Sequence, residues 1–378
     1  MSSSSTATAG KGLEGVVAAR TNLSDVQGDV GKLIYTGYDI DELAGQVSYE
    51  EVVYLLHHGH LPNPHELKEL KQTLAQYRDL PKGVIDIIKK LPRNTPPMSA
   101  LRTAVSALGC FDTMAENETM DAQRAKARRL IAQIGVCVAY FHRARQKKEL
   151  VPPDPTLGEA ANFLWMINGE KPNEEMVNTM DLCYVLHADH GMNASTFAAR
   201  VTIATLSDMY SAITTAIGTL KGPLHGGANE GVIKMLQEIG SLDHVDAYIE
   251  DALANKRKIM GIGHRVYKTL DPRAPHLQRM AQILSAKCGD PKWIQMSERI
   301  AQLMLQKKGL NANVDFYSAT VYFSLGIPTD LFTPIFAIAR TSGWTAHVLE
   351  QLADNRLIRP QSLYTGPMGL KVVPLDQR

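Results

Sequence analysis

The sequence predicts a mostly α-helical protein with a few short strands near its N-terminal end. From Ser48 onwards, apolar residues recur at helical spacing, between residues that typically begin and end helices. Strand signals are confined to residues 15–38. A charged segment also separates two apolar ones, which is typical of a small domain inserted into a large one. We therefore expect a large helical domain that carries a smaller inserted helical domain.

Residues 15–38 predict two or three short strands, because apolar stretches there flank the turn residues Gly28 and Gly31. Roughly fourteen to eighteen helices follow, counted from the apolar periodicity. Capping residues mark several helix starts. Ser48 has the spacing of a capping box with a glutamate three residues later, Thr156 has the same spacing with Glu159, and Asn63 precedes a first-turn proline.

The predicted domains follow the changes in composition along the chain. Residues 1–227 and 321–378 form the large domain, in which residues 1–11 are expected to be a disordered tail. Residues 228–320 form the small domain, because the helices there become charged and amphipathic. We expect the ligand cleft where the chain crosses between the two domains.

Composition excludes several classes of protein. Forty basic and 39 acidic residues leave a net charge of +1, which argues against nucleic-acid binding because phosphate affinity needs a basic surface. The four cysteines are far apart in the sequence, so neither a disulfide framework nor a zinc site is expected. We therefore expect a cytoplasmic protein with reduced cysteines. No signal peptide and no membrane-spanning segment are expected.

Two histidines lie among glycines. His225 belongs to GPLHGGAN, residues 222–229, just before a predicted helix. The positive end of the helix dipole favours a neutral imidazole there, which can polarise a carbonyl group; a histidine in a tight turn is the alternative. His264 ends a Gly-x-Gly run and follows the basic residues 256–258. That pattern suits a ligand with phosphate groups, and it also suits a solvated helix end.

Asp315 has apolar neighbours on both sides, which would raise its pKa towards the range of a general base. It is also placed to cap a helix over residues 316–325. Three arginines stand where a guanidinium needs a carboxylate partner, either from a ligand or from the protein: Arg273, Arg340 and Arg359. His187 and the histidine three residues later are expected on one helix face, but a third metal ligand is missing, so no metal site is predicted.

Four stretches resemble the citrate synthase family in their order and spacing. They are HADHGMNAST (residues 187–196), GPLHGGAN (222–229), GIGHRVYK followed by DPR (261–273) and NVDFYSA (313–319). The resemblance runs from Gly12 to the end of the chain. It implies the family's fold and the family's reaction, in which acetyl-CoA condenses with oxaloacetate and the resulting citryl-CoA is hydrolysed to citrate and CoA, the entry step of the tricarboxylic acid cycle.

The resemblance also implies roles for individual residues. The catalytic triad corresponds to His225, His264 and Asp315. The oxaloacetate ligands correspond to His190, Arg273, Arg340 and Arg359, of which the last reaches the partner's site in a homodimer. The coenzyme A contacts correspond to Lys258, Ile259, Met260, Gly261, Ile262 and Lys268. Coenzyme A enters as a thioester cosubstrate, and the resemblance implies neither a further cofactor nor a metal.

Two alternatives remain open at this point. The related 2-methylcitrate synthases use propionyl-CoA and share nearly all these residues, although they often have proline where this chain has Arg265. One methylene is worth only about 1–3 kcal/mol of discrimination, so some overlap in substrates is expected. A non-catalytic helical protein that binds coenzyme A or serves as a scaffold is the alternative from a different class. In the family that this chain resembles, the hexameric members regulated by NADH carry an extra N-terminal domain. The N-terminal part here is short, so we expect a dimer that NADH does not regulate.

Overall fold

The computed structural model describes residues 11–13, 15–288 and 291–378. Within them it has sixteen α-helices and one small sheet, as the sequence predicts. The α-helices are α1 (Ile40–Leu43), α2 (Tyr49–His58), α3 (Pro64–Tyr77), α4 (Lys82–Lys90), α5 (Pro97–Phe111), α6 (Met120–Arg145), α7 (Glu159–Asn168), α8 (Glu174–His187), α9 (Ala194–Ile203), α10 (Met209–Leu220), α11 (Ala228–Ile239), α12 (Val245–Ala254), α13 (Ala274–Cys288), α14 (Lys292–Lys308), α15 (Val314–Ser324) and α16 (Phe332–Ala353). Short 3-10 helices are η1 (Lys11–Leu13), η2 (Leu242–His244), η3 (Thr329–Leu331) and η4 (Leu375–Gln377). Residues 1–10 of the predicted disordered tail lie outside the described part, and Lys11 begins η1.

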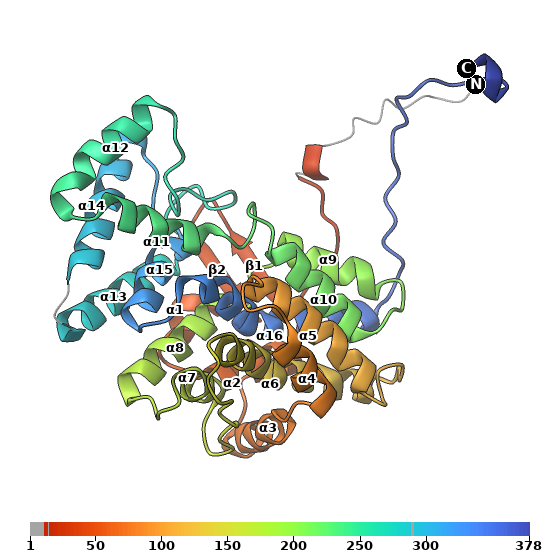
Figure 1. Cartoon of the computed structure of the whole chain (residues 1–378), viewed down its shortest axis with the longest axis horizontal. Helices are drawn as coiled ribbons and strands as arrows, with labels where there is room; N and C mark the ends of the chain where they lie inside the picture. The colour runs from red at the N-terminus through yellow and green to blue at the C-terminus, as the bar shows by residue number, and fades with distance from the viewer. Residues whose placement is uncertain (1–10, 14, 289–290) are drawn as a thin grey trace.

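The sheet has three antiparallel strands in the order β1-β2-β3. They are β1 (Ser24–Gln27), β2 (Lys32–Tyr35) and β3 (Tyr38–Asp39). Ser24 pairs with Tyr35 and Gln27 pairs with Lys32, so the first two strands form a hairpin with its turn at residues 28–31. In the view of Figure 1, β1 and β2 lie between α11 and α9.

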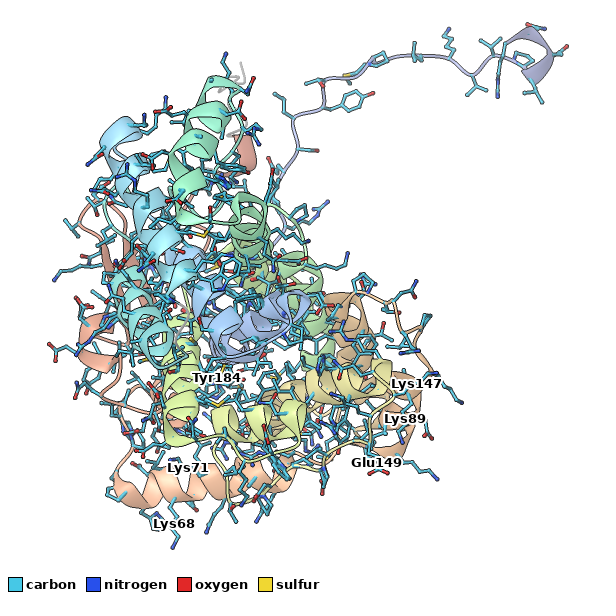
Figure 2. The ribbon with its side chains drawn as sticks, turned by 60° about the vertical axis from the view of Figure 1, so that its left-hand side comes forward. Lys68, Lys71, Lys89, Lys147, Glu149 and Tyr184 are labelled. Carbon is cyan, nitrogen blue, oxygen red and sulfur yellow. The ribbon has the colours of Figure 1, made fainter. Side chains whose placement is uncertain are left out.

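The largest part of the core surrounds α16, which packs against α2, α6, α8, α9 and α10. Almost every side chain of α16 is buried, including the large Trp344. The helix is enclosed on every side, and its buried residues include polar ones such as Arg340 as well as apolar ones. Figure 2 shows the contrast between interior and surface: Tyr184 lies in the interior, whereas Lys68 and Lys71 project from the exposed side of α3.

Helices α11 to α15 pack mainly against one another. Among them, α11 and α13 contact α15, and α12 contacts α14; α12, α13 and α14 lie together at the left of Figure 1. The link to the rest of the protein includes contacts of α11 with α16. The boundary predicted at residue 320 falls inside α15.

Two of the three predicted capping sites are confirmed. The Glu51 carboxylate accepts the Ser48 N–H at 2.7 Å, and the Asn63 side chain caps α3. The capping box predicted for Thr156 is wrong, because α7 begins at Glu159 with a glycine as its N-cap. The Thr156 N–H and hydroxyl instead donate to the carboxylate of Asp154, so the residue closes a turn before the helix.

Residues 354–378 leave the helical body as an extended segment that runs to the upper right of Figure 1. Large apolar side chains along it are exposed: Leu357, Leu363, Tyr364, Met368, Leu370, Val372, Val373 and Leu375. Among the described residues, no helix is both long enough and apolar enough to cross a membrane.

Candidate active site

His264 lies in the long loop between α12 and α13, and two backbone groups fix its ring. Its Nδ1 accepts the N–H of Val266 at 3.0 Å and the N–H of Tyr267 at 3.1 Å. A nitrogen that accepts hydrogen bonds carries no proton, so the ring proton is on Nε2. Burial, helped by the charge of Arg273, lowers the pKa of His264 to about 4. The imidazole is therefore neutral and presents Nε2–H as a donor.

His190 faces His264 across a short gap, with the ring centres 5.5 Å apart. The Tyr267 hydroxyl lies 3.1 Å from His190 Nε2, and burial holds the pKa of His190 well below its usual value. The expectation that His187 and His190 share a helix face is wrong. Helix α8 ends at His187, whose buried ring has Nδ1 2.7 Å from the Cys183 carbonyl oxygen.

Arg273 follows His264 in the same loop and is almost completely buried. Its Nε and one terminal nitrogen donate to the two oxygens of Asp271, at 2.9 and 2.8 Å. Asp271 also accepts the N–H of Val314 at the start of α15, at 3.1 Å. Burial raises the pKa of Asp271, but the adjacent guanidinium outweighs this effect and keeps it below the usual value. Asp271 thus joins the loop of His264 to the helix of Asp315.

Arg340 lies in the buried middle of α16 and points its guanidinium towards the turn of His190. Its Nε donates to the His187 carbonyl at 2.6 Å, and its guanidinium lies over the Phe336 ring. Burial lowers the pKa of Arg340 to about 10. The helix approaches this turn closely at Gly343, whose N–H donates to the carbonyl of Ala188 at 3.1 Å. A Cβ at residue 343 would lie 2.4 Å from that oxygen.

Asp315 is in the first turn of α15. The sequence left open that it caps this helix, but the cap is Asn313, which accepts the Asp315 N–H at 3.0 Å. Helix α15 begins two residues earlier than expected, and the carboxylate of Asp315 is therefore available for another task. Burial raises its pKa to about 6, against the opposing charge of Arg273.

His225 precedes the first residue of α11 by three positions. The Ser195 N–H donates to its Nε2 at 3.3 Å, and the Ser195 hydroxyl oxygen lies 2.8 Å from the same atom. The indole of Trp344 donates to that hydroxyl at 3.1 Å. With Nε2 accepting, the ring proton is on Nδ1. Burial and the charge of Arg340 lower the pKa of His225 to about 4.

The two buried arginines connect these groups electrostatically. The charge of Arg340 acts on the ionisation of His225, His190 and Asp315, and the charge of Arg273 acts on His190, His264 and Asp315. Six of the seven predicted catalytic and oxaloacetate residues are therefore these two arginines or groups on which their charges act. Arg359 is the exception, because it is exposed in the extended C-terminal segment.

The predicted coenzyme A segment, residues 258–262, runs beside the residues that precede α15. Ile262 forms a β-bridge with Ala312, and the carbonyl of Gly261 accepts an N–H of residue 313 at 2.9 Å. Ile259 and Gly261 are buried, Met260 and Ile262 are half-buried, and Lys258 and Lys268 are exposed. A cavity of about 250 Å³ is lined by His264, Lys268 and residues 309–313. A larger one, about 430 Å³, lies away from the site between α3 and residues 155–159.

Reasoning from the sequence missed the residues that hold the site in place. They are Ser195 and Trp344 beside His225, Tyr267 beside His190, Asp271 beside Arg273, and Asn313 at the start of α15. An available signal was that four of them stand within the four stretches already singled out. Trp344 lies outside those stretches, in a helix that looks like ordinary core.

Comparisons with known proteins identify the family of this chain. The family described as "Citrate synthase, C-terminal domain" matches residues 12–361. Citrate synthase 2 of Bacillus subtilis is 53% identical over 98% of this chain and 100% of its own length, and 2-methylcitrate synthase 1 of Corynebacterium glutamicum is 42% identical over 97% and 98%. The solved structure of Thermoplasma acidophilum citrate synthase in a ternary complex with carboxymethyl coenzyme A and oxaloacetate has a TM-score of 0.92, with 35% identity over 97% of this chain and 98% of that one. The chain belongs to the citrate synthase family.

Proposed function

We propose that His225, His264 and Asp315 carry out the condensation of acetyl-CoA with oxaloacetate, the reaction of the citrate synthase family. One observation carries this assignment. Two neutral histidines each have one ring nitrogen held as an acceptor, and the charge of Arg340 acts on one of them and that of Arg273 on the other. Both charges also act on a buried carboxylate whose pKa is raised. The relatives named above are enzymes, which favours catalysis over a scaffold or a non-catalytic CoA-binding protein.

Asp315 removes a proton from the acetyl methyl group. A base is most effective when its pKa is close to the working pH. Burial raises the pKa of the Asp315 carboxyl to about 6. The Nδ1–H of His225 hydrogen-bonds the thioester oxygen, where negative charge develops as the proton leaves. Such a fixed donor stabilises the enolate without reorganisation of solvent.

His264 acts on the second substrate. Its Nε2–H hydrogen-bonds the ketone oxygen of oxaloacetate and supplies the proton as the new carbon–carbon bond forms. Water then hydrolyses the citryl-CoA thioester, so that acetyl-CoA, oxaloacetate and water give citrate, CoA and a proton. The role of His264 is supported by the two backbone N–H groups that fix its tautomer.

The dicarboxylate is held by His190, Arg273, Arg340 and, from the partner subunit, Arg359. Planar guanidinium groups bind carboxylates through two parallel hydrogen bonds. The placement of Arg273 and Arg340 supports this assignment, because both are buried beside His190. Coenzyme A is assigned to residues 258–262 and Lys268, and the exposure of the two lysines supports contact with phosphate groups.

The enzyme is proposed to work as a homodimer in the cytoplasm. The exposed apolar side chains of residues 357–375 support a dimer, since a segment of this kind is stabilised by packing on a partner. Residues 228–320 are proposed as the small domain, which closes on residues 1–227 and 321–378 and excludes water. The described cysteines Cys110, Cys137 and Cys183 are free thiols, which supports a reducing compartment.

Use of propionyl-CoA to make 2-methylcitrate is the second candidate activity, favoured by the 42% identity to a 2-methylcitrate synthase. The test measures thiol release from acetyl-CoA and from propionyl-CoA, each with oxaloacetate. We expect the higher kcat/KM with acetyl-CoA. A higher value with propionyl-CoA would replace the assignment by 2-methylcitrate synthesis, and no thiol release from either substrate would overturn both.

A further inference from the structure

We propose that the β1–β2 hairpin positions the two substrate histidines, with Ser24 holding the turn of His190 and Gly28 holding the loop of His264. This inference deepens the proposed function and rests on it. Both residues act through their neighbours and are therefore positioning residues. The hairpin belongs to the N-terminal part of the chain, whereas His190 and His264 come from segments far along the sequence.

The open end of the hairpin, where Ser24 pairs with Tyr35, holds the turn around His190. The Ser24 hydroxyl donates to the carboxylate of Asp189 and accepts the Gly191 N–H at 3.0 Å. Tyr35, which pairs with Ser24 across the hairpin, donates its hydroxyl to the Asp189 carbonyl at 2.8 Å and accepts the Asp189 N–H at 3.2 Å. The residues on both sides of His190 are thus tied to the hairpin.

The turn of the hairpin holds the loop of His264. The Gly28 carbonyl accepts the Lys268 N–H at 3.0 Å, and the Gly28 backbone approaches Val266 so closely that a Cβ would lie 2.3 Å from the Val266 carbonyl oxygen. Val266 in turn donates its N–H to Nδ1 of His264. A displacement at Gly28 therefore reaches the catalytic ring through one intervening residue.

Together, the two contacts set the distance between the histidines. Strand β1 runs from Ser24 to the turn that contains Gly28, and its pairing with β2 keeps it extended. One end of β1 holds the turn of His190 and the other holds the loop of His264, and these two rings are 5.5 Å apart. A site built from loops needs rigid support of this kind, because its reacting groups must keep their positions within a fraction of an ångström.

The first test compares Gly28→Ala with Gly37→Ala. Alanine at residue 28 must push Val266 away, and a misplacement of about 1 Å can cost about 100-fold in rate. We expect kcat for citrate formation to fall by about 10- to 100-fold. Exchange of the acetyl methyl protons with solvent, measured with saturating unreactive oxaloacetate analogue, should stay near the wild-type rate because Asp315 and His225 carry it.

Gly37 is the matched control. It lies in the β2–β3 turn at φ +89°, and a Cβ there would contact nothing within 4 Å. Gly37→Ala strains the same sheet without touching the site, so it should lower Tm and leave kcat unchanged. A merely structural role of the hairpin predicts that both variants lower Tm and that neither changes the ratio of condensation to proton exchange.

The second test uses Ser24 and keeps the inference falsifiable if Gly28→Ala does not fold. Ser24→Ala removes the hydroxyl between Asp189 and Gly191, so the KM for oxaloacetate should rise about tenfold, and Ser24→Thr should restore it. A Gly28→Ala enzyme as active as Gly37→Ala, or an unchanged KM in Ser24→Ala, would overturn the inference. Absence of citrate formation by the wild-type chain would instead overturn the proposed function.

Discussion

At the residue scale, the buried Arg273 and Arg340 determine the ionisation of the site. Their charges add to the effect of burial on the histidines, so that all three imidazoles are neutral near pH 7. On Asp315 the same charges act against burial and limit the rise of its pKa to about 6. One pair of cations therefore makes neutral hydrogen-bond donors and an ionised base coexist in one site.

We predict that Asp315→Asn lowers kcat by about 10²–10⁴-fold, because loss of a positioned general base has that effect. Binding of oxaloacetate should survive, since Arg273 and Arg340 remain in place. Thiol release measures the first quantity and titration calorimetry the second. A folded Asp315→Asn enzyme with nearly normal kcat would show that another group removes the proton.

The pH dependence of the wild-type rate provides the control for this prediction. Only the ionised carboxylate accepts a proton, so kcat/KM should fall as the pH is lowered through about 6, the pKa of Asp315. His225 and His264, with pKa values of about 4, remain neutral over that range. The residual rate of Asp315→Asn should lack this acid limb.

At the element scale, the sequence predicted helices well and predicted the placement of side chains on them less well. Periodicity and caps located α2 and α3, because those signals are local. The capping box predicted at Thr156 was wrong because the Thr156 hydroxyl donates to the carboxylate of Asp154, two residues earlier, and not to the helix that follows. The prediction for His190 failed because α8 ends at His187, although the glycine in HADHG is a residue type that often follows a helix end.

The sequence predicted the site residues that lie in short motifs, but it did not predict the long-range contacts that hold them in place. His225, His264 and Asp315 stand in recognisable stretches. His264 is oriented by the nearby Val266 and Tyr267, whereas the bonds that hold His225 and the turn of His190 connect segments far apart in the chain, such as Trp344 to Ser195 and the hairpin to residue 189. Only the folded chain brings these partners together, so local patterns do not contain them.

Asn313 joins two elements, and we predict that Asn313→Ala affects both stability and rate. Its side chain caps α15 and donates to the Gly263 carbonyl at 2.7 Å, one residue before His264. Loss of the cap should lower the free energy of unfolding by about 1 kcal/mol, as urea titration would measure. Loss of the second bond should reduce kcat, because it ties the helix of Asp315 to the loop of His264.

Asn63→Ala is the matched control, because Asn63 caps α3 in the same way and lies away from the site. It should cost a similar free energy of unfolding, about 1 kcal/mol, and leave kcat unchanged. If Asn313→Ala is equally destabilised but fully active, the bond to residue 263 has no part in aligning the catalytic groups.

At the scale of the whole molecule, residues 354–378 stand apart from the body that carries the other site residues (Figure 1). Arg359 is exposed in this segment, so a dicarboxylate site that includes it requires a second chain. A two-fold dimer would then have two equivalent sites, each completed by the other subunit. Activity and dimerisation would be inseparable.

We predict that Arg359→Ala and Asp315→Asn subunits, each inactive alone, regain activity when mixed. In a hybrid dimer one site collects both defects and the other collects neither, so each hybrid should have up to about half the activity of a wild-type dimer. Native mass spectrometry establishes that hybrids form, and thiol release measures the activity. Hybrids that stay inactive would place Arg359 in its own subunit's site.

The contact of Gly343 with the turn of His190 makes one amide of α16 an indicator of local motion. Its N–H donates to Ala188, outside its own helix. Deuterium uptake at this amide therefore follows separation of α16 from the turn rather than fraying of the helix. Since Arg340 lies three residues earlier and donates to the carbonyl of His187 in the same turn, faster exchange at Gly343 would show that α16 and this turn separate even when no substrate is present.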